Sequence, residues 1–564
     1  MLRPTAIPTC GVAVFLWEET TMETRLAVIA GYFVAVLGIG LMARTRWRST
    51  PEEFFLAGRG LGSFVLLGTM MATNFSAFTV FGASGAGYRD GYAFFPIMGF
   101  GTGFMALNFW LLGRKVWEIG KFNNILTPAE LIAFRYESRY LSVLFALVMI
   151  VFTIPYLALQ PMAGGYVLQE LFGIPHSMGA FLITAAIMLY VFRGGLKAVA
   201  WTDVFQGILM VTLMIAALIM VAQHYGGFGA ANEAVRAIRP ELMSRPGGQG
   251  RYSPEIWISY LMLWFFCDPM FPQLFQRFFS AKDAGAIRRS MLLYPLVCNL
   301  VFFLPVTLGV FGTLAVPGLT GKQADQILPI MLTHIFGDFM ATLIMSAGLA
   351  ALMSTMDSQL LTLSSIFTRD IFPFVTRKLA GNAIQGKIFV VFLSMIGLFF
   401  ATRPSSTILK IATQAFTGLA VLFPTTLFAL YSKKPSPGAA ITSIILGEVL
   451  VVFSYLGWFP SGGFLPAIPI VIIAFMAYLV VMVLSSSRFK FATFRVRGNA
   501  VFAILFATLF ILSVDWWQWS SSRYTLGGFP LWIFYFMGLS AVQTLLMKYW
   551  SKDSQKETLG HAEV

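Results

Sequence analysis

Long apolar stretches alternate with short polar ones along most of this chain. Apolar runs of about 20 residues recur between residues 25 and 549, and a helix of that length crosses the hydrocarbon core of a bilayer. The hydropathy pattern predicts about fifteen membrane spans, at 25–44, 61–84, 92–113, 140–170, 177–192, 198–223, 255–280, 288–314, 331–366, 385–402, 405–431, 437–457, 465–486, 500–518 and 526–547. No polar stretch leaves room for a soluble domain, so we expect an all-α polytopic membrane protein.

The charge distribution supports this interpretation. Only 11% of the 564 residues are charged, whereas soluble domains carry roughly 25%. With the N-terminus outside, roughly 28 of the 39 Lys and Arg fall in cytoplasmic loops, Arg277 and Lys282 among them. The net charge of +14 therefore reflects orientation in a lipid bilayer and contact with its headgroups, and no nucleic-acid partner is expected. We predict a multi-pass protein of the inner (cytoplasmic) membrane whose C-terminus is cytoplasmic.

Residue types that carry enzymatic or metal chemistry are scarce. The three cysteines have no paired spacing and the four histidines are scattered, so we expect neither a disulfide framework nor a zinc site. We see no nucleophile–base pair and predict neither an enzyme nor a cofactor. Residues 1–22 form an N-terminal extension before the first clean helix, and translation from Met22 fits the pattern as well as translation from Met1.

Two spans are interrupted in their middle. The span at 61–84 contains the polar, weakly helical segment 72–76, and the span at 255–280 contains two prolines, Pro269 and Pro272. Proline removes a backbone donor and clashes with the preceding turn. Backbone groups freed at membrane depth must then be satisfied by protein, water or an ion. One alternative is that these residues only kink tightly packed helices.

The position of the two interruptions favours a transporter. Each interrupted span opens a run of five predicted helices, one over about 61–223 and the other over about 255–431. Paired broken helices in corresponding positions are typical of transporters built from an inverted repeat, with the binding site at the breaks. The sequence therefore predicts a solute site between the spans at 61–84 and 255–280.

A third span, at 331–366, carries a stripe of hydroxyl groups. Ala351, Ser354, Thr355 and Ser358 share one helix face, since positions three and four apart are neighbours. Hydroxyl and carbonyl oxygens suit a hard cation, although such a stripe can also join helices by hydrogen bonds. Beside a broken helix that exposes carbonyls, an ion site is the better interpretation.

Several segments resemble one known transporter family. The segments that carry the resemblance lie at 58–62, 85–88, 194–206, 351–355 and 367–370, with a weaker match at 416–419. The stretch at 194–206 is close to a family signature. These residues are similar to the sodium/solute symporter (SSS) family, and nearest to its pantothenate, monocarboxylate and proline carrier branches.

The resemblance implies a fold and a sodium site. The fold is a five-plus-five inverted repeat of the leucine-transporter type with discontinuous helices. Sodium, the coupling ion, would be held by the backbone carbonyls and hydroxyls of Ala72, Phe75, Ala351, Ser354 and Thr355. Asp203 matches the aspartate of the signature, which implies a role on the ion's inward path or at a second ion.

The chain departs from two branches at the expected solute site. It has Asn74 where proline carriers have an aspartate, and Phe78 and Thr79 where sugar carriers have a Glu-Gln pair. A sugar substrate is therefore disfavoured. The candidate substrate-site residues are Asn74, Ser76, Thr79, Asp268 and Gln273. Asp268 lies in the second break, where it either caps the following half-helix or contacts the solute or a coupling cation.

Together these features predict a sodium-coupled secondary active symporter that imports a small polar organic solute. We favour a monocarboxylate, a pantothenate-like organic acid or an amino acid. The alternatives are a transporter-like membrane sensor with a separate signalling partner and an uncoupled or proton-coupled carrier. The expected domains are the symporter core at 23–486, two additional C-terminal helices at 487–549 and a cytoplasmic tail at 550–564. The oligomeric state is left open.

Overall fold

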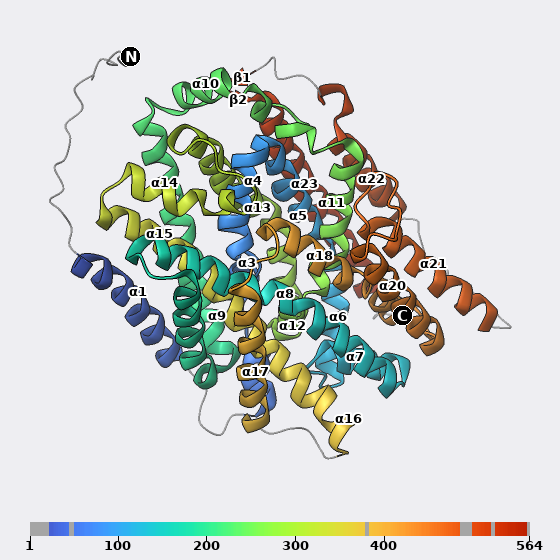
Figure 1. Cartoon of the computed structure of the whole chain (residues 1–564). Coiled ribbons are helices and arrows are strands. Elements are labelled where there is room, and N and C mark those ends of the chain that lie inside the picture. The colour runs from blue at the N-terminus through green and yellow to red at the C-terminus, as the bar shows by residue number, and fades with distance from the viewer. Residues whose placement is uncertain (1–21, 44–49, 378–382, 486–498, 520–524, 561–564) are drawn as a thin grey trace, which may run out of the picture.

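The computed structural model describes residues 22–43, 50–377, 383–485, 499–519 and 525–560. In these residues the chain is almost entirely helical (Figure 1), and eleven helical stretches are long and apolar enough to cross a membrane. A two-stranded antiparallel sheet, β1 (Thr525–Leu526) with β2 (Phe529–Pro530), joins the last helices. The prediction of a mostly helical membrane protein is confirmed, whereas the predicted count of about fifteen spans is not. The predicted extension at 1–21 lies outside the described residues.

The helices have the following bounds. In the first half of the chain they are α1 (Met22–Ala43), α2 (Pro51–Leu56), α3 (Ser63–Asn74), α4 (Ala83–Asp90), α5 (Phe94–Met105), α6 (Arg114–Phe122), α7 (Pro128–Tyr136), α8 (Arg139–Phe172), α9 (His176–His224), α10 (Phe228–Ile238), α11 (Pro254–Cys267) and α12 (Pro272–Ser280). In the second half they are α13 (Ala284–Ala315), α14 (Ile327–Ile335), α15 (Asp338–Ile366), α16 (Phe372–Thr376), α17 (Ala383–Ala401), α18 (Ile408–Ala420), α19 (Phe423–Tyr431), α20 (Pro437–Tyr455), α21 (Ala467–Ser485), α22 (Asn499–Val514) and α23 (Leu531–Gly560).

The predicted spans at 177–192 and 198–223 correspond to the two arms of α9, which kinks between them at Gly195, where φ is 60°. Elsewhere the helices differ from the predicted spans. The predicted span at 331–366 is two elements, because α14 ends at Ile335 and α15 begins at Asp338. Helix α23 runs to Gly560, so the predicted tail at 550–564 begins as helix. The hydropathy pattern therefore marked apolar lengths correctly and helix junctions less well.

Both predicted interruptions are present. Helix α3 ends at Asn74, Phe75 leaves helical geometry with φ −86° and ψ 88°, and helix resumes in the π-helical turn η2 (Phe78–Gly82). Helix α11 ends at Cys267, passes through the 3₁₀ turn η7 (Asp268–Met270) and restarts as α12 at Pro272. The proline at a first helical position needs no donor there. Helices α3 and α12 contact each other in the centre of the molecule.

Small residues allow two helices of the core to approach very closely. A Cβ placed on Gly309 of α13 would lie 2.0 Å from the Ser84 carbonyl oxygen, and one on Gly87 of α4 would lie 2.3 Å from that of Val306. Only glycine fits at both positions. Close backbone approach of this kind is how helices gain packing energy in lipid, where no hydrophobic effect drives them together.

A buried ion pair attaches the C-terminal helices to the rest of the molecule. Arg245, in the segment between α10 and α11, donates to Asp515, which follows α22, at 2.8 Å, and neither side chain is exposed. The guanidinium also lies 4.4 Å from the Trp519 ring centroid and 4.8 Å from that of Phe536. These contacts compensate in part for the hydration free energy that the two charged groups lose on burial.

Loss of one partner from this pair should destabilise the protein, because it leaves the other charge buried and uncompensated. We expect Asp515→Asn to cost about 3–5 kcal/mol and to lower the apparent melting temperature of the purified protein. The double variant Arg245→Met with Asp515→Leu should recover most of that loss. Glu118→Gln is the control, since Glu118 pairs with Arg114 on the surface of α6 and should cost less than about 1 kcal/mol. Equal melting temperatures for Asp515→Asn and Glu118→Gln would contradict this interpretation.

Candidate functional site

Four of the five predicted sodium-site residues meet between α3 and α15. The Ser354 hydroxyl lies 2.9 Å from the Ala72 carbonyl oxygen, and the Thr355 hydroxyl lies 3.3 Å from the same oxygen. The two hydroxyls also lie 3.1 and 3.2 Å from the Ala351 carbonyl oxygen. All four residues are buried. Two carbonyls and two hydroxyls thus converge on one place, and all are neutral oxygen donors of the kind hard cations take.

The break in α3 explains why the Ala72 carbonyl is available. The last carbonyls of a helix have no partner within that helix, and α3 ends two residues after Ala72. Hydroxyl donors from α15 take the place of the missing backbone donor. Phe75 forms the break itself, so its carbonyl is released from regular helical bonding in the same way.

Asp203, on α9, belongs to a buried charged network. Its carboxylate accepts hydrogen bonds from the Thr69 hydroxyl at 2.5 Å and from the Arg277 guanidinium at 2.9 Å. Arg277 also donates to the Ser358 hydroxyl at 2.6 Å. The network therefore joins α3, α9, α12 and α15, and Ser358 follows Ser354 by one helical turn. Through Arg277 and Ser358, Asp203 is connected to the face of α15 that carries the predicted sodium-site hydroxyls.

The assignment of Arg277 to a cytoplasmic loop was wrong. Arg277 is fully buried on α12, which continues for three residues after it. The sequence did contain a signal, because Arg277 lies five residues after Pro272, within the half-helix that restarts at the second break. Charge counting alone assigned it to a loop, since a lone arginine in an apolar span is costly and its partner Asp203 is 74 residues away.

A small cavity lies where the two breaks meet. Its walls come from both broken helices and from α5, α8, α13 and α18, and they are mostly aromatic. The lining residues are Asn74, Phe78, Met98, Thr102, Tyr156, Trp264, Asp268, Phe271, Phe302 and Phe416. Two of the predicted substrate-site residues, Asn74 and Asp268, are therefore brought together. They lie 194 positions apart in the sequence, and only the crossing of the two broken helices makes them neighbours.

Asn74 and Asp268 form the polar part of this cavity. The Asn74 amide donates to the Tyr294 hydroxyl at 2.6 Å and also hydrogen-bonds the Asp268 side chain. The Asp268 carboxylate accepts a hydrogen bond from the Cys267 thiol at 3.3 Å. Both residues are almost fully buried. The carboxylate makes no hydrogen bond to the N-terminus of α12 that would identify it as a helix cap.

The structure does not bring the other three substrate candidates to this cavity. Ser76 accepts from the Phe78 backbone N–H and from the Tyr156 hydroxyl, so it caps the restarting helix. Gln273 is fully buried, and both polar atoms of its amide lack a hydrogen-bond partner. Neither side chain is among the residues that line the cavity.

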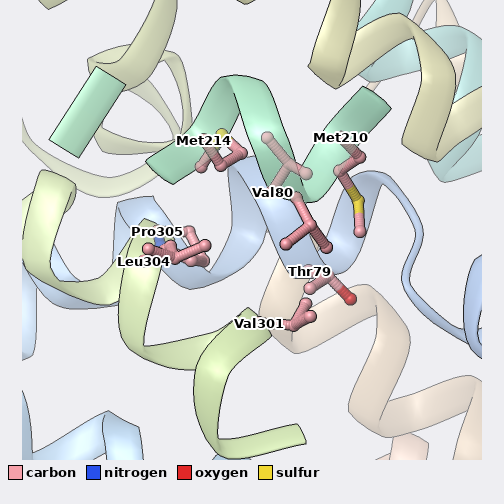
Figure 2. Close-up of a pocket in the computed structure, with 8 residues that line it drawn as sticks. Thr79, Val80, Met210, Met214, Val301, Leu304 and Pro305 are labelled. Carbon is pink, nitrogen blue, oxygen red and sulfur yellow. The ribbon is translucent and has the colours of Figure 1, made fainter. Parts of the chain in front are cut away.

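Thr79 lines a second, apolar cavity. Figure 2 shows it beside Val80, between the methionines of α9 and the aliphatic residues of α13. Its hydroxyl has no hydrogen-bond partner. A site with one hydroxyl and otherwise aliphatic and thioether walls offers little to a polar solute, which leaves the first cavity as the solute-site candidate.

Sequence reasoning missed the aromatic walls. Phe271 and Trp264 flank the second break, and Phe416 belongs to the weakly matching segment at 416–419, so a signal was present for three rings. Tyr156 has no local signal, because it is one of many apolar residues in the 34-residue helix α8. Its hydroxyl contact with Ser76 connects residues 80 positions apart.

Comparison with known proteins supports the resemblance. The model of the sodium:solute symporter family matches residues 54–447. The sodium/pantothenate symporter of Escherichia coli (strain K12) is 28% identical over 467 residues, covering 81% of this chain and 96% of that protein. The sodium/proline symporter of the same strain is 28% identical over 457 residues, covering 78% and 89%.

Solved transporter structures share the fold. A Na⁺-coupled sialic acid symporter in a substrate-bound, outward-open state superposes with a TM-score of 0.68 at 19% identity, covering 82% of this chain and 98% of that one. A transporter of the nucleobase-cation-symport-1 family gives a TM-score of 0.55 at 13% identity, covering 79% and 98%. Both the matched segment and the fold include the two broken helices, and the chain belongs to the sodium:solute symporter family.

Proposed function

We propose that this protein imports a small polar organic solute by coupling its entry to that of sodium. The observation that carries the proposal is the convergence of the Ala72 and Ala351 carbonyls with the Ser354 and Thr355 hydroxyls at the break of α3. Sodium bound to these oxygens and to the Phe75 carbonyl would hold α3 against α15. The solute would bind beside it, in the cavity between the two breaks.

The proposed architecture is an inverted repeat. The first repeat opens with α3 and η2, and the second opens with α11, η7 and α12, so that each contributes one discontinuous helix to the site. Rigid-body rocking around a fixed central site would expose the solute alternately to the two sides. We propose that the N-terminus lies outside and the C-terminus lies in the cytoplasm of a cell's inner membrane, as the distribution of Lys and Arg indicates.

The sodium gradient supplies enough free energy for accumulation. One charge crossing about 100 mV yields about 2.3 kcal/mol, and a sodium gradient of about tenfold adds about 1.4 kcal/mol. One sodium per neutral solute therefore supports accumulation of roughly several hundredfold. A monoanionic solute, such as a monocarboxylate or pantothenate, would cancel the voltage contribution and would need a second ion.

Removal of both hydroxyls should weaken sodium binding. We expect Ser354→Ala with Thr355→Ala to raise the sodium concentration for half-maximal uptake by at least about tenfold, since hydrogen bonds to charged groups contribute about 1.5–3 kcal/mol each. The measurement is sodium-driven uptake of a solute panel in membrane vesicles. Ser346→Ala is the matched control, because the Ser346 hydroxyl bonds only to carbonyls of its own helix. An unchanged sodium requirement in the double variant would remove the site assignment.

Asp203 and Arg277 should act as one unit. Asp203→Asn removes the carboxylate that pairs directly with Arg277 and leaves that cation with only the more distant attraction of Asp357. We therefore expect a raised sodium requirement together with a loss of stability of up to about 3–5 kcal/mol. Replacing both, as Asp203→Asn with Arg277→Gln, removes the pair as a unit and should restore most of the stability. Sodium titrations of uptake and melting temperatures test this, while the order of preference among solutes should not change. Additive losses in the double variant would show that the two residues act independently.

A further inference from the structure

Aromatic rings that contact one another cluster along the walls of the solute cavity, and we call this cluster the aromatic cage. The Phe416 ring of α18 lies 4.7 Å from the Phe271 ring, 4.9 Å from that of Tyr156 and 5.5 Å from that of Trp264, measured between centroids. Phe78 closes the cage from the first broken helix, 5.7 Å from Trp264. These five rings come from η2, α8, α11, α18 and the break at Phe271. Aromatic faces carry negative electrostatic potential, so they attract a cation.

One carboxylate lies in this cage without a cationic partner. Asp268 is 2% exposed, and none of the ion pairs in the described part of the chain includes it. Its hydrogen-bond partners, the Cys267 thiol and the Asn74 amide, are neutral. A buried carboxylate that lacks a counter-charge is costly, and an anionic solute bound beside it would add repulsion. A cationic group in the cavity would remove both costs.

We propose that the cavity binds a small solute through an alkylated ammonium group, whose charge is held by the Asp268 carboxylate and the faces of the surrounding rings. This inference rests on the proposed function, because it names the substrate class of the same site. Ring faces and methyl groups fit one another without hydrogen bonds, whereas a primary ammonium has three N–H donors to satisfy. The cage offers few acceptors beyond Asp268, Asn74 and Thr102, which favours a quaternary or highly alkylated nitrogen.

A trimethylammonium solute also carries a short polar arm, and the cavity has polar residues beside its rings. The Asn74 amide and the Thr102 hydroxyl, which both line the cavity, are placed to hydrogen-bond the polar arm.

Equilibrium binding to the purified full-length protein in saturating sodium tests the proposal. The probes are choline, glycine betaine and 3,3-dimethylbutan-1-ol, which has the shape of choline but no charge. We expect choline or glycine betaine to bind and the neutral alcohol to bind at least about tenfold more weakly, because the alcohol gains no cation–π attraction. Equal affinities for choline and the alcohol, or no binding of either ammonium compound, would overturn the proposal.

Two variants test the residues that hold the charge. Asp268→Asn and Trp264→Leu should each weaken binding of the ammonium probe by about tenfold or more, while the sodium requirement stays the same. The matched controls are Glu448→Gln, another carboxylate loss on a membrane helix, and Trp458→Leu, a tryptophan that is 69% exposed; neither should change binding. If Asp268→Asn raised the sodium requirement and left ammonium binding intact, Asp268 would hold an ion and not the solute.

Transport in proteoliposomes separates this inference from the proposed function. A cationic solute moving with one sodium carries two charges inward per solute, a zwitterion carries one and a monoanion carries none. Sodium-driven uptake of pantothenate that choline and betaine do not inhibit would overturn the inference and leave the symporter function intact. If the ammonium probe bound with an affinity independent of sodium, and a sodium gradient drove no accumulation, the symporter function would be overturned. The proposal that the cavity binds an alkylated ammonium group would remain.

Discussion

The break of α3 is the constraint on which the rest of the site depends. A helix that stops inside a membrane exposes carbonyls that no water can satisfy. Here the Ala72 carbonyl receives two hydroxyls from α15. The same break turns Asn74 toward the second broken helix, so in the proposed mechanism one interruption serves both the ion and the solute. Sodium binding and solute binding would then be coupled through a few residues of backbone rather than through a long relay.

The sequence predicted those parts of the site that depend on local spacing. Helical periodicity placed Ser354 and Thr355 on one face, and two prolines marked the break near Asp268. Contacts between helices that are distant in the sequence could not be predicted, because periodicity carries no information about which helix packs against a given face. Arg277 was therefore assigned to a loop, although it lies beside Asp203 in the interior. Tyr156 was missed for the same reason, since it looks like any other apolar residue of α8.

The sequence predicted the fold in the same way, with the local features correct and the contacts between elements missing. Apolar length identified most of the helices, and the pairing of interruptions indicated the transporter class. Helix junctions were less accessible, because an apolar pattern runs smoothly across 331–337, where α14 gives way to α15. Hydropathy reports the solvent around a segment, whereas a junction is set by backbone conformation at one or two residues.

The pairing of Arg245 with Asp515 has a consequence for how the protein is made. The two residues are 270 positions apart, and Asp515 lies beyond the family-matched segment at 54–447. During synthesis, Arg245 emerges long before its partner and stays an unpaired cation until the penultimate helix has been threaded into the bilayer. The segment between α10 and α11 therefore reaches its final packing only at the end of translation. A chain released early by the ribosome would contain Arg245 without its carboxylate partner and without the tryptophan ring that packs against it.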